Sequence, residues 1–180
     1  MTTKSYLTKA PSRWLALLAI LLISAMFRWF RIESQSLWYD EGYSLVFSGG
    51  RSVWESIAGI AGASGSDRFQ PAYYVLLHLW RAALGSSEFW LRSLSAILGM
   101  LAVVVVYVAA HQLLNAKAAL LAGLGISVSA FAIIYSQEVR PYALIVLVAA
   151  VQLWAAARIV SEPSATHRWK WVLWDSFFVG

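Results

Sequence analysis

The sequence of 180 residues contains no cysteine, which excludes disulfides, zinc–thiolate centres and cysteine nucleophiles. Charge is also scarce, because Asp, Glu, Lys and Arg make up only 13% of the chain. An average soluble domain carries about 25% charged residues. Apolar residues instead reach 60%, and the mean hydropathy is +0.64. These values indicate a protein that is surrounded by lipid.

The charge that is present is mostly positive, with a formal net charge of +5 and a pI of about 9.7. A basic protein can bind nucleic acid, but no basic stripe interleaved with aromatic residues on a polar surface is present. Lys and Arg also accumulate in the cytoplasmic loops of membrane proteins. We therefore expect membrane lipids as surroundings and no nucleic-acid partner.

Long intervals without charge predict the membrane spans, because about 20 apolar residues are needed to cross a hydrocarbon core about 30 Å thick. Four such intervals predict an all-α polytopic membrane protein. The first interval could also be a signal peptide, but the absence of an A-x-A-like cleavage site after it favours a retained anchor. The predicted order is a cytoplasmic N-terminus (1–13), span 1 (14–31), an external loop (32–92), span 2 (93–112), span 3 (117–135), an external turn (136–140), span 4 (141–158) and the start of a fifth span (171–180).

The orientation does not follow from a simple count of basic residues, since Lys and Arg divide evenly between the two sides. All the lysines, however, fall on the side of the N-terminus, and most of the acids fall on the other side. This pattern favours a cytoplasmic N-terminus. Because the last apolar run is only half a span long, we expect the sequence to belong to a longer protein.

A first surface helix is predicted over 53–61, within the external loop. Ser52 and Glu55 have the spacing of a capping box, in which the hydroxyl and the carboxylate accept hydrogen bonds from free backbone N–H groups. The segment that follows is rich in Gly and Ser and is predicted to be a loop.

A second surface helix is predicted over 71–84. This stretch is apolar but too short for a span. Its polar residues Tyr74, His78 and Arg81 are spaced so that they share one helical face. We expect an amphipathic helix that lies on the membrane surface.

An acidic pair, Asp40-Glu41, follows the first predicted span and is flanked by Trp38, Tyr39 and Tyr43. Carboxylates beside aromatic faces suit a sugar or a prenyl chain, although Trp and Tyr also gather at membrane interfaces. The pair could equally cap a loop helix or neutralise a nearby arginine.

A second polar patch lies in the turn between spans 3 and 4, where Glu138 and Arg140 precede Pro141. Proline disfavours helix in the residue before it and suits the first turn of the next helix. The two ionisable residues would then share the membrane face of Asp40-Glu41, and such residues near the core mark candidate functional sites. A salt bridge that closes the turn is the alternative.

Four segments, in order, resemble the bacterial GT-C glycosyltransferases of the protein-mannosyltransferase and aminoarabinose-transferase type. Together they span residues from about 12 to 160. The segments are SLWYDE at 36–41, QPAYY at 70–74, GSSEFWLR at 85–92 and YSQEVRPYAL at 135–144.

The resemblance implies a truncated GT-C-type transmembrane module with amphipathic helices in the first external loop. It implies transfer of a sugar from a polyprenyl-phosphate donor to a hydroxyl on a protein or glycolipid, at the outer face of the bacterial inner membrane. Asp40 would be the catalytic base of an inverting reaction, with Glu41 beside it. The donor-side and phosphate-binding candidates are Glu138, Arg140, Arg92, Tyr142 and Gln70.

Several points stay open. The sequence identifies no definite cofactor, although Glu138 could hold a divalent metal. Many relatives have His-Pro-Pro where this chain has Gln70-Pro71-Ala72, and a neutral amide cannot act as an acid or base. The chain of 180 residues by itself is expected to be inactive. A transporter or channel fragment and a non-enzymatic membrane assembly subunit remain the alternatives.

Overall fold

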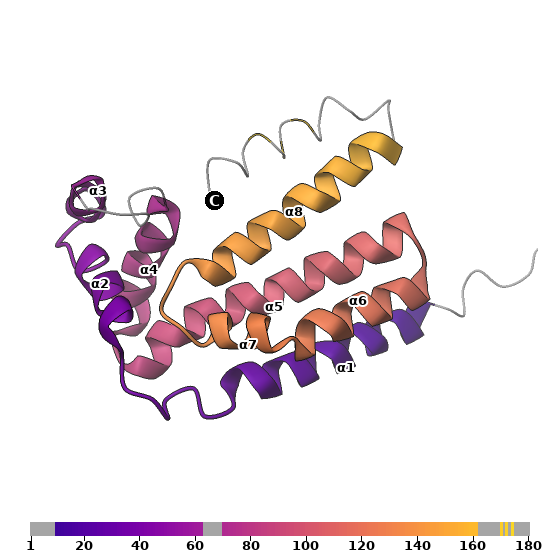
Figure 1. Ribbon diagram of the computed structural model, residues 1–180, viewed down its shortest axis with the longest axis horizontal. Helices are drawn as coiled ribbons and strands as arrows, with labels where there is room; N and C mark the ends of the chain where they lie inside the picture. The colour runs from indigo at the N-terminus through magenta and orange to yellow at the C-terminus, as the bar shows by residue number, and fades with distance from the viewer. Residues whose placement is uncertain (1–9, 63–69, 162–169, 171, 173, 175–180) are drawn as a thin grey trace, which may run out of the picture.

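The computed structural model describes residues 10–62, 70–161, 170, 172 and 174. Within these ranges all regular structure is helical, as the sequence predicts. Figure 1 shows long helices lying side by side and three shorter ones, α2, α3 and α4, gathered at one end. The helices are α1 (Ala10–Trp29), α2 (Tyr39–Phe47), α3 (Val53–Ala61), α4 (Pro71–Leu84), α5 (Glu88–Leu113), α6 (Ala116–Val128), α7 (Ala130–Ser136) and α8 (Tyr142–Ser161).

Two of the described helices, α5 and α8, are long and apolar enough to cross a membrane, and the pair α6 and α7 meets the same test together. The apolar part of α1, Trp14–Trp29, is shorter. The predicted start of a fifth span lies almost entirely outside the described residues. The all-α membrane module is therefore confirmed.

The segment 117–135, predicted to be one straight span, is bent by 56° between α6 and α7. The Ser129 backbone is extended, and its hydroxyl accepts a hydrogen bond from the Ala132 N–H at 3.4 Å. Serine is a favoured N-cap because it bonds an N–H group that the helix leaves free. Ser129 thus begins a new helix where the sequence pattern predicts an uninterrupted one.

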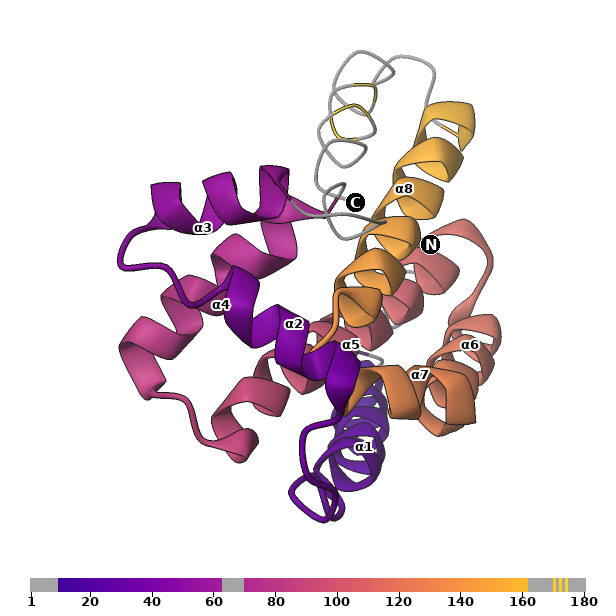
Figure 2. The ribbon, with the colours of Figure 1, turned by 60° about the vertical axis from the view of Figure 1, so that its left-hand side comes forward.

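The loop between α1 and α5 contains α2 in addition to helices at the two expected positions, 53–61 and 71–84. The Ser52 hydroxyl caps α3 by accepting a hydrogen bond from the Glu55 N–H at 3.2 Å. The Glu55 carboxylate accepts one from the Arg51 N–H at 2.7 Å. Figure 2 shows α2, α3 and α4 as a cluster beside the first turns of α5.

The face of α4 that carries Tyr74, His78 and Arg81 packs against α2 and its C-terminal end. The Tyr74 ring lies 5.3 Å from the Phe47 ring, centroid to centroid. The Arg81 guanidinium donates to the Leu45 carbonyl oxygen at 2.9 Å, and His78 Nδ1 lies 3.1 Å from the Ser48 carbonyl oxygen. The polar face thus joins the loop helices to one another.

Arg28, at the end of α1, is fully buried. Its guanidinium donates to the Ser24 hydroxyl at 2.6 Å and to the Ser136 hydroxyl at 3.2 Å. It also donates to the carbonyl oxygens of Ser127 and Ile126, at 3.3 and 3.4 Å. These carbonyls belong to the last turn of α6, where a helix leaves acceptors free and its dipole attracts a cation. Arg28, which the sequence indicates only as the border of a span, therefore supports the bend between α6 and α7.

Candidate functional site

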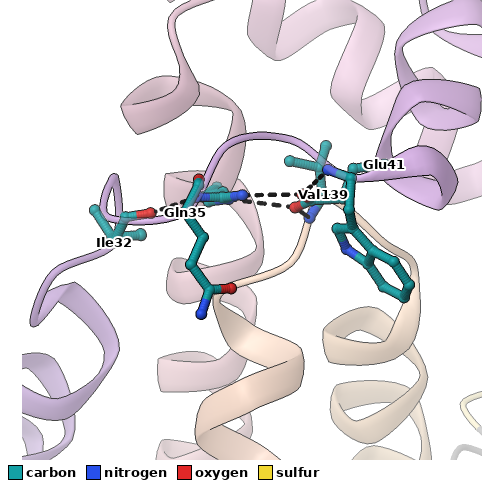
Figure 3. Close-up of polar contacts among 6 residues, drawn as sticks. Ile32, Gln35, Glu41 and Val139 are labelled. Carbon is teal, nitrogen blue, oxygen red and sulfur yellow. Dashed lines mark hydrogen bonds and ion pairs between the residues drawn. The ribbon is translucent and has the colours of Figure 1, made fainter.

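Glu41 lies in the first turn of α2 and is fully buried. Its Oε1 accepts hydrogen bonds from the Arg92 Nε at 3.2 Å and from the Val139 N–H at 2.8 Å. Its Oε2 accepts from the Arg92 Nη2 at 2.9 Å and from the Trp38 N–H at 3.3 Å. Four donors thus surround this carboxylate, and Figure 3 shows it next to Val139.

Arg92, in α5, forms the other half of this buried ion pair. Its Nη1 donates to the carbonyl oxygens of Ile32 and Gln35, each at 2.7 Å (Figure 3). A two-pronged contact between guanidinium and carboxylate is among the strongest polar contacts in proteins. The guanidinium is thereby directed at the protein itself, and it ties α5 to the segment between α1 and α2.

Arg140 joins the turn between α7 and α8 to the same end of α2. It is largely buried, and its Nη1 donates to the Asp40 carbonyl oxygen at 3.3 Å. Its guanidinium lies 5.5 Å from the centroid of the Tyr142 ring, and its Nη2 is 3.5 Å from the Tyr142 hydroxyl. The hydrogen bond from Arg140 to the Asp40 carbonyl and the one from the Val139 N–H to Glu41 together hold the first turn of α2 against the segment between α7 and α8.

Asp40 is half-buried, and no hydrogen bond or ion pair engages its carboxylate within the described part of the chain. The adjacent hydroxyls of Tyr39 and Tyr43 are 2.8 Å apart. That hydrogen bond, together with the negative charge of Asp40, raises the pKa of Tyr43. Of the acidic pair, Asp40 therefore presents a carboxylate that can act on another molecule, whereas Glu41 is surrounded by protein donors.

Glu138 lies in the turn between α7 and α8, beside a cavity of about 630 Å³. Its Oε2 is buried and has no hydrogen-bond partner among the residues described. Burial raises the pKa of Glu138, and repulsion by Glu41 adds to this, while Arg140 opposes it. The cavity is lined by Phe30, Arg31, Ile32, Ser34, Gln35, Ser36, Trp38, Glu41, Arg92, Ile134, Gln137 and Glu138.

Two residues of this region were not singled out by the sequence. The Gln137 amide donates to the carbonyl oxygens of Phe27 at 3.0 Å and Phe30 at 3.2 Å, and so caps the end of α1. Arg31 lines the cavity and has a left-handed backbone, with φ at 55°. Gln137 stands within the family-like segment 135–144, whereas the only sequence signal for Arg31 was its position at a predicted span end.

Gln70 directly precedes α4, and no hydrogen bond links it to Glu41, Arg92 or Arg140 within the described ranges. No group of three or more His, Asp or Glu side chains is placed to share a metal ion in the residues that the structure describes. Glu138 could thus supply one ligand, and a metal there stays a prediction.

A comparison with known protein families identifies the family of this chain. The family model described as dolichyl-phosphate-mannose-protein mannosyltransferase matches residues 70–180. The chain belongs to this family. The predicted relationship to GT-C mannosyltransferases is confirmed, and the family's members use a sugar carried on a polyprenyl phosphate. Searches of curated proteins and of solved structures gave no significant match.

The matched part of the chain begins at Gln70 and so includes α4 to α8, with Arg92, Glu138 and Arg140. It does not include α2. The family therefore supports a membrane glycosyltransferase, whereas the role of Asp40 depends on the geometry described above.

Proposed function

We propose that the protein transfers a sugar from a polyprenyl-phosphate donor to a hydroxyl acceptor, with inversion at the anomeric carbon and with Asp40 as the base. The reaction would take place at the extracytoplasmic face of the bacterial inner membrane. The observation that carries the proposal is the difference in hydrogen bonding between the two carboxylates of the acidic pair. Glu41 is held by four donors, and Asp40, beside it, is left with a carboxylate that can accept a proton.

In this reaction the Asp40 carboxylate takes the proton of the acceptor hydroxyl. The acceptor oxygen then forms a bond to the anomeric carbon from the face opposite the phosphate. The bond from the anomeric carbon to the phosphate oxygen breaks, and its electron pair leaves with the polyprenyl phosphate. Since a phosphate is a good leaving group, a second carboxylic acid is not required as a proton donor.

The surrounding residues would hold Asp40 in place, because transfer depends on reacting atoms held close to their productive geometry. Arg140 bonds the Asp40 carbonyl, and Glu41 anchors the same helical turn to Val139 and Arg92. We assign Glu41 and Arg92 a positioning role. Glu138, Arg140 and Tyr142 remain the candidates for binding the donor. A divalent metal held by Glu138 stays a prediction.

The transporter alternative has one observation in its favour, the bent pair α6 and α7 around the buried Arg28. Transporters place such breaks beside a substrate path. Here the guanidinium is bonded to protein oxygens, and the adjoining cavity measures only about 10 Å³. That volume holds no more than a single water. The bend between α6 and α7 is thus explained as a structural feature and not as part of a substrate path.

The test is the Asp40→Asn variant, assayed in membranes with a polyprenyl-phosphate-linked sugar. Asparagine keeps the size of the side chain but cannot take the proton, and removing a general base typically slows a reaction by about 10²–10⁴-fold. Glu33→Gln, at an exposed acid of the same loop, is the matched control and should retain activity. Equal rates in both variants, with equal protein in the membrane, would remove Asp40 from the chemistry.

A further inference from the structure

Three aromatic side chains follow one another along α2, and we call Tyr39, Tyr43 and Phe47 the aromatic strip. Their spacing of four residues places them on one face of the helix. The Tyr39 and Tyr43 rings meet edge to face at 5.1 Å, and the Tyr43 and Phe47 rings are stacked at 6.1 Å, centroid to centroid. The Phe47 ring in turn meets the ring of the fully buried Tyr74 at 5.3 Å. The strip is therefore anchored in the protein at one end and ordered along its length.

The other end of the aromatic strip is exposed. Tyr39 is 76% exposed and Tyr43 is 42% exposed. Their hydroxyls are 2.8 Å apart, so one of them donates a hydrogen bond to the other. A tyrosine hydroxyl can both donate and accept, so the pair can still bond to another molecule. An aromatic surface that is already held in place by such contacts loses little conformational entropy when a ligand binds to it.

Asp40 borders the aromatic strip, because it lies three residues before Tyr43 on α2 and residues so spaced are neighbours on a helix surface. The two side chains interact through charge, since the hydrogen bond from Tyr39 and the negative charge of Asp40 both raise the pKa of Tyr43. Tyr43 therefore keeps its proton at neutral pH and can donate it in a hydrogen bond. A carboxylate, two aromatic rings and two hydroxyls thus share one exposed surface.

A sugar ring matches this surface better than other molecules that carry a hydroxyl. Its C–H face packs on an aromatic ring, and its hydroxyls bond to the tyrosine hydroxyls and the carboxylate. An extended peptide is held by backbone hydrogen bonds to a sheet edge, and the described part of the chain offers only helices around Asp40. An anionic acceptor would be repelled by the Asp40 carboxylate. The surface therefore favours an uncharged sugar.

We propose that the aromatic strip binds the acceptor and that the acceptor is an uncharged sugar unit of a glycan, with one ring hydroxyl directed at Asp40. In the transfer this hydroxyl loses its proton to Asp40, and its oxygen forms a bond to the anomeric carbon of the donor. The bond from that carbon to the phosphate oxygen breaks, and its electron pair leaves with the polyprenyl phosphate. The acceptor role rests on the proposed function, whereas the binding of a neutral sugar to the strip does not.

Sugar binding is measured without turnover, by saturation-transfer NMR on the protein in nanodiscs of neutral lipid. The probes are the methyl glycosides of mannose, glucose and galactose, and the aromatic protons of the protein are irradiated. Tyr39→Ala and Tyr43→Ala should each raise the dissociation constant of the bound glycoside about tenfold, as expected for the loss of an aromatic contact. Tyr39→Phe and Tyr43→Phe keep the rings and should cause smaller increases. Tyr39 is largely exposed, so its variants guard against a loss of packing at Tyr43.

Trp54→Ala is the matched control. Trp54 is 78% exposed, more than either tyrosine, and it lies on α3 outside the aromatic strip. Its replacement should change the dissociation constant less than about twofold. Exposed aromatic residues also anchor proteins at membrane interfaces, and with that role alone the three alanine variants would behave alike.

Transfer assays in membranes assign the bound sugar as the acceptor. Tyr43→Ala should raise the KM for a neutral glycoside about tenfold and leave the KM for the polyprenyl-phosphate sugar unchanged. Asp40→Asn should instead lower kcat and leave glycoside binding intact. Failure of every glycoside to bind, equal effects of Trp54→Ala and Tyr43→Ala, or transfer to a threonine-containing peptide but to no glycoside would overturn the proposal. Full transfer by Asp40→Asn, with glycoside binding still lost in Tyr43→Ala, would sink the proposed base and keep the sugar-binding strip.

Discussion

Two buried arginines of this protein are neutralised in different ways. Arg92, in the first turns of α5, faces the Glu41 carboxylate and two carbonyl oxygens. Arg28, beside the bend between α6 and α7, is bonded to hydroxyls and carbonyl oxygens and has no carboxylate partner in the described structure. The first arrangement ties loop segments around a candidate site. The second uses the end of a helix to hold a cation in the membrane-spanning part. Arginine therefore positions loop segments at one place and supports a bent span at the other.

The largest effect should come from breaking the ionic arrangement. Glu41→Met leaves Arg92 buried without its carboxylate, and removal of one partner of a buried pair typically costs about 3–5 kcal/mol. The measurement is the thermal unfolding of the purified protein in detergent. Glu33→Met, at an exposed acid, is the control and should stay within about 0.5 kcal/mol.

The double variant Glu41→Met/Arg92→Met sharpens the same comparison. With both charges removed, the buried penalty disappears, so the double variant should be more stable than Glu41→Met alone. If the double variant were the less stable of the two, Arg92 would contribute mainly through the carbonyls of Ile32 and Gln35.

A smaller effect is expected at the Arg28 end. A Cβ built on Gly99 would lie 2.9 Å from the Arg28 Nε and in collision with the Ser136 hydroxyl. Gly99→Ala should therefore destabilise the protein by about 1–3 kcal/mol, the usual range for overpacking. Gly125→Ala, in α6, has no atom within 4 Å of the added Cβ and is the matched control. Indistinguishable unfolding midpoints for the two alanine variants would argue against close packing around Arg28.

The smallest effect should be the pH dependence set by Glu138. Its pKa is raised in the folded protein, so the folded state keeps this proton to a higher pH than the unfolded chain does. Stability should then fall as pH rises from the ordinary pKa of a glutamate, about 4.3, through the raised value. Glu138→Gln should lack this part of the pH dependence and lose less stability across the window. Parallel stability–pH curves for the two proteins would contradict the raised pKa.

Local patterns in the sequence were enough to place much of the helical structure. The capping residues Ser52 and Glu55 and the spacing in 71–84 mark helices that begin where α3 and α4 begin. The bend at Ser129 was missed because an apolar run long enough to span indicates one helix, and a single serine inside it is a weak signal. α2 was considered only as the alternative in which the acidic pair caps a loop helix, because it is short and its acidic first turn also fits a loop.

The candidate site was less accessible from the sequence for a different reason. Asp40-Glu41 and the turn around Glu138 could be recognised as polar patches on one membrane face. The two acids differ because the Glu41 carboxylate is bonded by Arg92 and Val139, which are 51 and 98 residues away from Glu41 in the sequence. Contacts over such distances leave no trace in local spacing. The cavity and its cation Arg31 were hidden for the same reason, since the lining comes from separate segments.

The hydrogen bond from the Val139 N–H to the Glu41 carboxylate has a consequence for how the site moves. Amide protons in a turn usually exchange rapidly with solvent, whereas this one is donated to a buried acceptor on another helix. Its exchange requires α2 and the turn to separate, so its protection measures the free energy of that opening. A single backbone proton thus reports how often α2 separates from the turn that contains Val139, without any substrate being present.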